Sequence, residues 1–245
     1  MDADAALDVL RDAARDLADA SADLDRIVPT YPGWTVADLV VHTGRIHRWV
    51  AEIVASRAAQ RLPKPELGQR PDDLLAWFRD GTDRVIDTLA ATSPTTPVWT
   101  FAGEHTAGFW RRRMALETTI HRWDAQRAAG HSAQIAGAVA VAGVSEALQI
   151  YLVPRLQGAD VGGRGEIVSL RTADGVALWA VRLRQDAIDV LTDDPPADVR
   201  VEATPSDLWL FLMGRAGREV LDVHGPVNGV DRLQRAVALL PTPAG

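Results

Sequence analysis

Apolar residues recur at helical spacing through the first half of this chain, and this period constrains the fold more than any other feature of the sequence. Apolar residues three and four positions apart share one face of a helix, which then packs against its neighbours. Thr35, with Asp38 three residues later, predicts a capping box before the second of these segments. The pattern covers residues 3–28, 39–57, 72–89 and 106–129. We therefore expect a four-helix bundle with at least one longer crossover between its helices.

The pattern changes after residue 132. Residues 134–156 still have helical spacing, and helical spacing returns at 205–213 and 229–240. Short alternating or β-branched segments, separated by Gly, Asp and Pro, occur between them, at residues 166–171, 176–184, 187–191 and 199–203. The sequence thus predicts two domains, a bundle over 1–132 and an α+β domain with a mostly antiparallel sheet over 133–245.

Charge and composition exclude several classes of function. The net charge of -7 is spread over both halves, which disfavours nucleic-acid binding because phosphates require a basic face. The N-terminus is acidic and amphipathic, and no uninterrupted apolar stretch approaches the length that spans a membrane. We expect a cytoplasmic protein. The chain has no cysteine, so any catalytic thiol must come from another molecule.

Three side chains predict a metal site in the bundle. Glu117 and His121 are four residues apart, hence on one face of the fourth helix. His42 lies on the apolar face of the second helix and points inward. Two histidines and one carboxylate form a recurrent catalytic zinc set that leaves a position open for water or substrate. The alternative is that such a pair occurs by chance and that His42 is an ordinary core histidine.

Several other polar and aromatic residues occur in the helices and loops of the predicted bundle. Asp124 either orients the His121 imidazole or pairs with Arg127. His47 and His105 are expected at the surface or rim. The arginines at 111–113 are expected on a solvated helix face, with the alternative that one of them reaches an anionic substrate. Five tryptophans are expected in the core or in pocket walls: Trp34, Trp49, Trp99, Trp110 and Trp123.

These residues resemble a known family. The string from Pro32 to His42, PGWTVADLVVH, and the string from Trp110 to Asp124, WRRRMALETTIHRWD, are similar to the N-terminal domain of mycothiol-dependent maleylpyruvate isomerases, within the wider DinB-like group. The resemblance implies that the histidine ending the first string and the Glu-x-x-x-His of the second bind the metal. Those positions are His42, Glu117 and His121.

The second half resembles the same family more weakly. Residues 209–215 and 223–225 are similar to a C-terminal signature in which an arginine approaches the active site, and Arg215 or Arg218 is the candidate. The resemblance also implies a sterol-carrier-like form for this domain. It implies mycothiol as the thiol cosubstrate, with Arg113 and Trp110 as candidate contacts and Asp124 and Arg215 as candidate catalytic groups.

The expected chemistry leaves alternatives open. A metal-bound thiolate would attack a small electrophile, either to isomerise it or to remain attached as a transferase product. The rivals are a non-catalytic ligand-binding or regulatory module and a metal-dependent hydrolase. Zinc is the expected metal, with nickel, iron and manganese as alternatives. We expect a monomer or homodimer, with no nucleic-acid or membrane partner.

Overall fold

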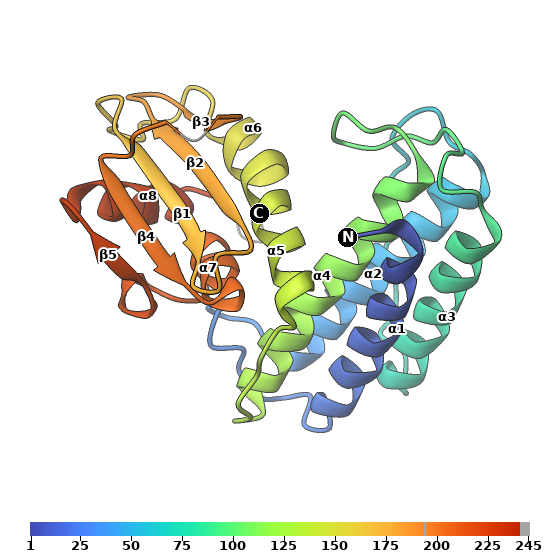
Figure 1. Ribbon diagram of the computed structural model, residues 1–245. Helices are drawn as coiled ribbons and strands as arrows, with labels where there is room; N and C mark the ends of the chain where they lie inside the picture. The colour runs from blue at the N-terminus through green and yellow to red at the C-terminus, as the bar shows by residue number, and fades with distance from the viewer. Residues whose placement is uncertain (194, 241–245) are drawn as a thin grey trace. The chain divides into compact units, whose positions relative to one another are not determined.

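The computed structural model describes residues 1–193 and 195–240 of the chain, so the last five residues of the expected second domain lie outside it. It divides into two compact units, Met1–Gln134 and Ile135–Gly245. Each unit is described by itself. The first is all-helical and the second combines helices with a sheet, as the sequence predicted (Figure 1).

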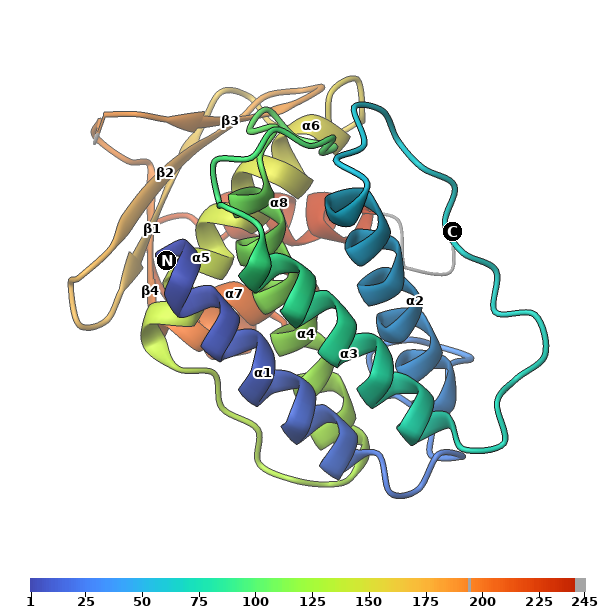
Figure 2. The same ribbon diagram turned by 90° about the vertical axis from the view of Figure 1, so that its right-hand side faces the viewer.

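The first unit is a four-helix bundle whose helices lie side by side (Figure 2). Its helices are α1 (Ala3–Ala20), α2 (Val36–Ala55), α3 (Leu74–Ala91) and α4 (Ala107–Ala128). The α2–α3 connection runs back along the bundle, which is the predicted long crossover. The capping box at Thr35 is confirmed: its hydroxyl accepts from the Asp38 backbone, and the Asp38 carboxylate accepts from the Thr35 N–H.

The first helix is shorter than its apolar pattern predicted. It ends at Ala20, and the Ser21 hydroxyl donates to the Leu17 carbonyl at 2.7 Å. Beyond it, Ile27 forms an isolated bridge with Thr35, and Val28 is fully buried from this non-helical segment. Val28 and, in part, Leu24 pack against the core, whereas Ile27 is exposed, so the apolar spacing of residues 21–28 does not mark a helical backbone.

The second unit contains a five-stranded sheet in the order β3-β2-β1-β4-β5. β1 pairs parallel with β4, whereas β1–β2, β2–β3 and β4–β5 are antiparallel, which confirms a mostly antiparallel sheet. The strands are β1 (Ile167–Thr172), β2 (Leu178–Leu183), β3 (Ile188–Leu191), β4 (Val199–Ala203) and β5 (Asp222–His224). The last was not predicted, because three residues are too few to show an alternating pattern.

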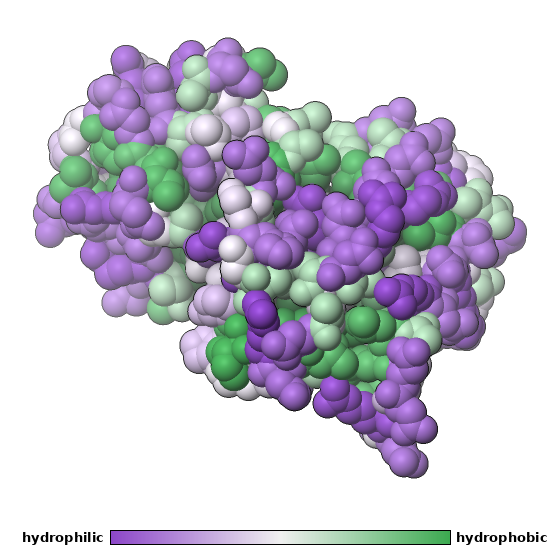
Figure 3. Space-filling view, turned by 90° about the horizontal axis from the view of Figure 1, so that it is seen from below, coloured by the Kyte–Doolittle hydropathy of each residue, from purple (hydrophilic) through white to green (hydrophobic). Residues whose placement is uncertain are grey.

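Helices cover the sheet of this unit. Val199, Val201 and Ala203 alternate inward along β4 while Arg200 is exposed, so one face of the sheet carries the core. The helical elements are α5 (Gly137–Glu146), the π-helical turn η1 (Ala147–Leu152), α6 (Val153–Arg155), α7 (Pro205–Leu212), the 3-10 turn η2 (Arg218–Val220) and α8 (Asn228–Ala238). On the face of the molecule shown in Figure 3, hydrophilic residues predominate and hydrophobic residues form smaller patches.

One helical stretch of the second unit is notable for its length and apolar composition. Gly137–Arg155 is long and apolar enough to cross a membrane by length and composition, with a mean hydropathy of 1.4 over its best window. It is not an uninterrupted apolar stretch of the kind that the sequence predicted to be absent, because Ser145, Glu146 and Gln149 lie within it. Length and composition alone support a membrane span only weakly, because core helices of globular proteins pass the same test, and Val144, Leu148 and Leu152 are fully buried within this fold.

Candidate metal centre

His42, Glu117 and His121 come together between α2 and α4. His42 lies in the second turn of α2, and the other two lie one turn apart on α4. The helices meet here because α2 and α4 run antiparallel: His42 lies opposite Glu117 and His121, and Trp49 lies opposite Trp110. Within the described residues, this is the group of three histidine or acidic side chains close enough to hold one ion.

The spacing of the donor atoms fits a tetrahedral metal. Nε2 of His42 and Nε2 of His121 each lie 3.2 Å from Oε1 of Glu117, and the three donor atoms lie within 4.8 Å of one another. Bonds of about 2.0–2.1 Å to nitrogen and oxygen place neighbouring tetrahedral donors roughly 3.3 Å apart. The donor set, two imidazoles and one carboxylate, also matches that of catalytic zinc sites. The residues present therefore fit a divalent ion with an open coordination position.

Asp124 holds the His121 ring. Its Oδ2 lies 3.1 Å from Nδ1 of His121, and its Oδ1 accepts a hydrogen bond from the Thr30 hydroxyl at 2.7 Å. With Nδ1 donating to this carboxylate, Nε2 would be available to bind a divalent ion beside Glu117. Of the two roles considered for Asp124, the structure shows the contact with His121. Thr30 was missed by the sequence analysis, because it lies in a turn 94 positions away.

Arg113 pairs with Glu117 through the carboxylate oxygen that faces away from the histidines. Its guanidinium donates to Oε2, while Oε1 faces both imidazoles. Both side chains of the pair are nearly buried. Arg113 therefore orients the carboxylate ligand, and the expected direct contact with the thiol cosubstrate stays a prediction.

The charges at the site act on one another. Burial would raise the pKa of Glu117, but Arg113 and His121 outweigh it and hold that pKa well below its usual value. Burial likewise opposes protonation of His121, but the carboxylates of Glu117 and Asp124 raise its pKa. For His42, burial prevails and lowers the pKa. The site thus keeps Glu117 ionised.

The expected solvated face of arginines is wrong for two of the three residues. Arg111 and Arg113 are only 4% and 6% exposed, whereas Arg112 is partly exposed and pairs with Glu104. Arg111 donates to the carbonyls of Leu89 and Thr92 and also pairs with Asp4. The reason is that α4 is buried on nearly every side, so its polar residues must find partners inside the bundle.

His47 is also not at the surface. It is fully buried, with Nδ1 3.0 Å from the Thr82 hydroxyl and Nε2 2.8 Å from the Thr118 hydroxyl. Burial lowers its pKa to about 3, so the ring is neutral and joins α2 to α3 and α4. The burial of His47 could have been predicted from the sequence, because His47 continues a second apolar stripe on α2 that faces α3. His105 is exposed, as expected.

The tryptophans divide between the core and the region of the site. Trp34 lies 5.3 Å from the His42 ring, centre to centre, so it forms part of the wall beside the ligands. Trp110 is 1% exposed, and its indole N–H donates to the Trp99 carbonyl at 2.8 Å. Its polar group is therefore already used, and its position supports a packing role. Its contact with the cosubstrate remains untested.

The C-terminal candidates belong to the second unit. The Arg215 guanidinium donates to the Met213 carbonyl at 2.7 Å, just after α7. Arg218 begins η2 and pairs with Asp231 of α8 at 3.2 Å. A catalytic role for Arg215 therefore stays a prediction.

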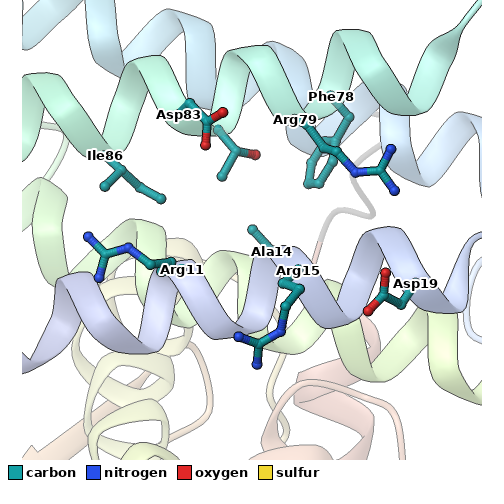
Figure 4. A pocket seen from close by; sticks show the side chains of 9 residues that line it. Arg11, Ala14, Arg15, Asp19, Phe78, Arg79, Asp83 and Ile86 are labelled. Atoms are coloured by element: carbon teal, nitrogen blue, oxygen red, sulfur yellow. The ribbon is translucent and has the colours of Figure 1, made fainter.

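A groove between α1 and α3 is separate from these ligands (Figure 4). Two of its cations are already paired, Arg11 with Asp8 at 2.8 Å and Arg15 with Asp12 at 2.9 Å. Its lining is formed by Arg11, Ala14, Arg15, Asp19, Phe78, Arg79, Thr82, Asp83 and Ile86. The carboxylates among the residues that line and flank the groove make it a poor site for an anion. None of the three metal-site residues lines the groove.

The fold and the site together define a class: a helical bundle with a two-histidine, one-carboxylate centre, joined to an α+β domain. Residues 3–126, half of the chain, match the family model described as the mycothiol maleylpyruvate isomerase N-terminal domain. The chain belongs to this family. No curated protein has a sequence that matches it.

Solved structures share the fold over nearly the whole chain. The crystal structure of the mycothiol-dependent maleylpyruvate isomerase aligns with a TM-score of 0.65 at 15% identity, covering 91% of this chain and 93% of that one. A variant of that enzyme with one histidine replaced by alanine aligns with a TM-score of 0.63 at 14% identity and the same coverage. At these identities the likeness shows the fold alone.

Proposed function

We propose that this chain is a metal-dependent enzyme that uses mycothiol as an external thiol, acting as a cis–trans isomerase of the maleylpyruvate isomerase type or as a thiol transferase. The observation that carries the proposal is the buried cluster of His42, Glu117 and His121, three protein donors within 4.8 Å in a chain without cysteine. Membership of the family adds support.

The residues of the site have distinct tasks in this proposal. A divalent metal would supply Lewis acidity, keeping a coordinated thiol deprotonated near neutral pH. His42, Glu117 and His121 hold the ion. Asp124 fixes the tautomer and orientation of His121, and Arg113 fixes the rotamer of Glu117.

The surroundings protect the nucleophile. The ring centres of Tyr31 and Trp34 lie 5.0 Å apart in a tilted arrangement, and the two rings border those of His121 and His42, so aromatic surface replaces water next to the ligands. A partly dry site strengthens the electrostatic interactions within it. The isomerase and transferase reactions differ only after the thiol has added to the electrophile. In an isomerase the thiol leaves again after rotation about the substrate bond, and in a transferase the adduct is released.

The test combines metal content with thiol dependence. We expect about one zinc or other divalent ion per chain in untagged wild-type protein by mass spectrometry, lost in His42→Ala and His121→Ala and retained in His131→Ala, whose side chain is exposed. Turnover of maleylpyruvate should require both metal and mycothiol. A folded wild type that binds no metal would favour the non-catalytic binding module, and turnover without thiol would favour the hydrolase.

The remaining predictions belong with this proposal. We infer zinc as the native metal, a cytoplasmic location and a monomer or homodimer, with a small electrophile and mycothiol as partners. Metal content of protein purified from its own source and the mass of the protein in solution would test these points.

A further inference from the structure

We propose that the sheet of the second unit binds a small organic phosphate on its open face, through Arg171, Arg182 and Arg200. These arginines lie on β1, β2 and β4, which are neighbours in the strand order. Arg171 and Arg200 are exposed and Arg182 is half-buried. The proposal is independent of the proposed function, because the three arginines belong to the second unit and the metal-site residues to the first.

The two faces of the sheet differ in what covers them. A Cβ on Gly229 of α8 would lie 3.1 Å from Val199 and 3.4 Å from Val168, so α8 packs on the face that carries these valines. Figure 1 shows α7 and α8 behind the strands. Side chains alternate along a strand, so Ser169 and Arg171 lie on the opposite face.

The strand register brings the three arginines around one point of the open face. Ser169 is the register partner of Arg200 on β4 and of Ala180 on β2. Arg171 is two residues from Ser169 along β1, and Arg182 is two residues from Ala180 along β2. Partners on neighbouring strands are about 5 Å apart, and diagonal neighbours are about 7–8 Å apart. Three long side chains with these origins can reach one ligand above Ser169.

Small side chains occupy the centre of the cluster. Ser169 is 6% exposed and Ala180 is 3% exposed, although both lie on the open face of the sheet. They are therefore lower than the longer side chains around them. The Ser169 hydroxyl adds a hydrogen-bond donor between the arginines.

The charges of the three arginines are not neutralised within the described residues, where their guanidinium groups form no hydrogen bond or ion pair. Asp189 is the register partner of Arg182, but it pairs with Arg184 at 3.3 Å. Glu202 is the register partner of Arg171 and forms no ion pair with it. Three like charges around one point repel one another, and a bound anion would relieve that repulsion.

The chemistry favours a single phosphate group. Guanidinium groups are planar forks that bind phosphate through paired hydrogen bonds, and a phosphate has enough oxygens for several forks, whereas a carboxylate has two. Carboxylates flank the cluster at Asp189, Glu202 and Asp222, and the chain has a net charge of -7. The positive potential is therefore local, which favours one compact anionic group over an extended polyanion or an anionic lipid surface.

The experiment titrates the full chain with glycerol 3-phosphate and follows the backbone amide signals of β1, β2 and β4 by NMR at low ionic strength. We expect saturable shifts at millimolar concentration, which glycerol and acetate do not reproduce. Arg200→Met and Arg171→Met should each weaken binding about threefold to tenfold. Glu202→Gln removes a flanking negative charge and should strengthen binding.

Arg235→Met is the matched control, because it removes one exposed positive charge from α8, which packs on the other face of the sheet. Equal losses in Arg200→Met and Arg235→Met, or equal saturation by acetate, would overturn the proposal. Binding to vesicles that contain phosphatidic acid, without shifts from glycerol 3-phosphate, would overturn it as well. None of these readouts involves metal content or thiol-dependent turnover, so the proposed function is tested separately.

Discussion

Oδ2 of Asp124 lies 3.1 Å from Nδ1 of His121, deep in the bundle where neither side chain is more than 2% exposed. Carboxylates in this position fix the tautomer of a metal-binding histidine and raise its basicity. Asp124→Asn keeps the shape but loses the charge, and we expect metal affinity to fall about 10- to 100-fold. Competition with a chelator of known affinity measures it.

The Thr30 hydroxyl provides a graded comparison for this prediction. Thr30→Val removes the hydrogen bond to the other Asp124 oxygen and leaves the contact with His121 in place. Its effect on metal affinity should be clearly smaller than that of Asp124→Asn. Equal affinities of wild type and Asp124→Asn would show that this carboxylate does not tune the metal.

Arg113→Met should destabilise the metal-free protein much more than the loaded one. Removing one partner of a buried ion pair leaves the Glu117 charge with only the imidazoles beside it, at a cost of up to about 3–5 kcal/mol. A bound divalent ion would neutralise that charge, so zinc should recover part of the loss. Urea unfolding with and without zinc measures both free energies of unfolding.

Arg112→Met is the control for the neighbouring arginine. Its partner Glu104 is 53% exposed, so loss of this pair should change the free energy of unfolding by less than about 1 kcal/mol. If Arg113→Met behaved like Arg112→Met in metal-free protein, the buried pair with Glu117 would have no energetic weight.

His47 should make the bundle acid-sensitive. Burial lowers its pKa from 6.5 to about 3 in the folded protein, so below pH 6.5 the unfolded chain binds a proton that the folded one does not. The associated stability is complete above pH 6.5 and is lost as the pH falls toward 3, by up to about 1.4 kcal/mol per pH unit.

His47→Gln removes this titration while leaving a side chain that can bond Thr82 and Thr118. In metal-free protein, the free energy of unfolding should therefore depend less steeply on pH in His47→Gln than in wild type between pH 6 and 4. Urea unfolding across this range measures the slopes. Parallel curves for the two proteins would contradict the assignment.

Gly143 should be intolerant of a side chain. A Cβ there would lie 2.3 Å from the ring of Trp209, which is buried on α7. We expect Gly143→Ala to cost about 1–3 kcal/mol through overpacking. Gly137→Ala, at the start of the same helix, has 3.9 Å of space and should be neutral or slightly stabilising. Thermal unfolding measures the change in stability of each variant. A loss in Gly143→Ala no larger than in Gly137→Ala would contradict the prediction.

Local patterns in the sequence determined the helices, the main strands and two of the three residues of the candidate metal centre. Glu117 and His121 share a helix face because of their spacing alone, and the Thr35 capping box follows from three neighbouring positions. Such features depend on contacts within one or two turns, so the local sequence contains them. The end of α1 was misplaced, because apolar spacing reports burial and does not distinguish a helix from a turn that faces the core.

Only the tertiary structure decided which residues complete the site. His42 meets Glu117 because α2 and α4 pack antiparallel, and Thr30 meets Asp124 across 94 positions. The burial of Arg113 depends on which faces the neighbouring elements cover. These contacts join residues far apart in the chain, and their geometry is set by helix packing, which a local period does not specify.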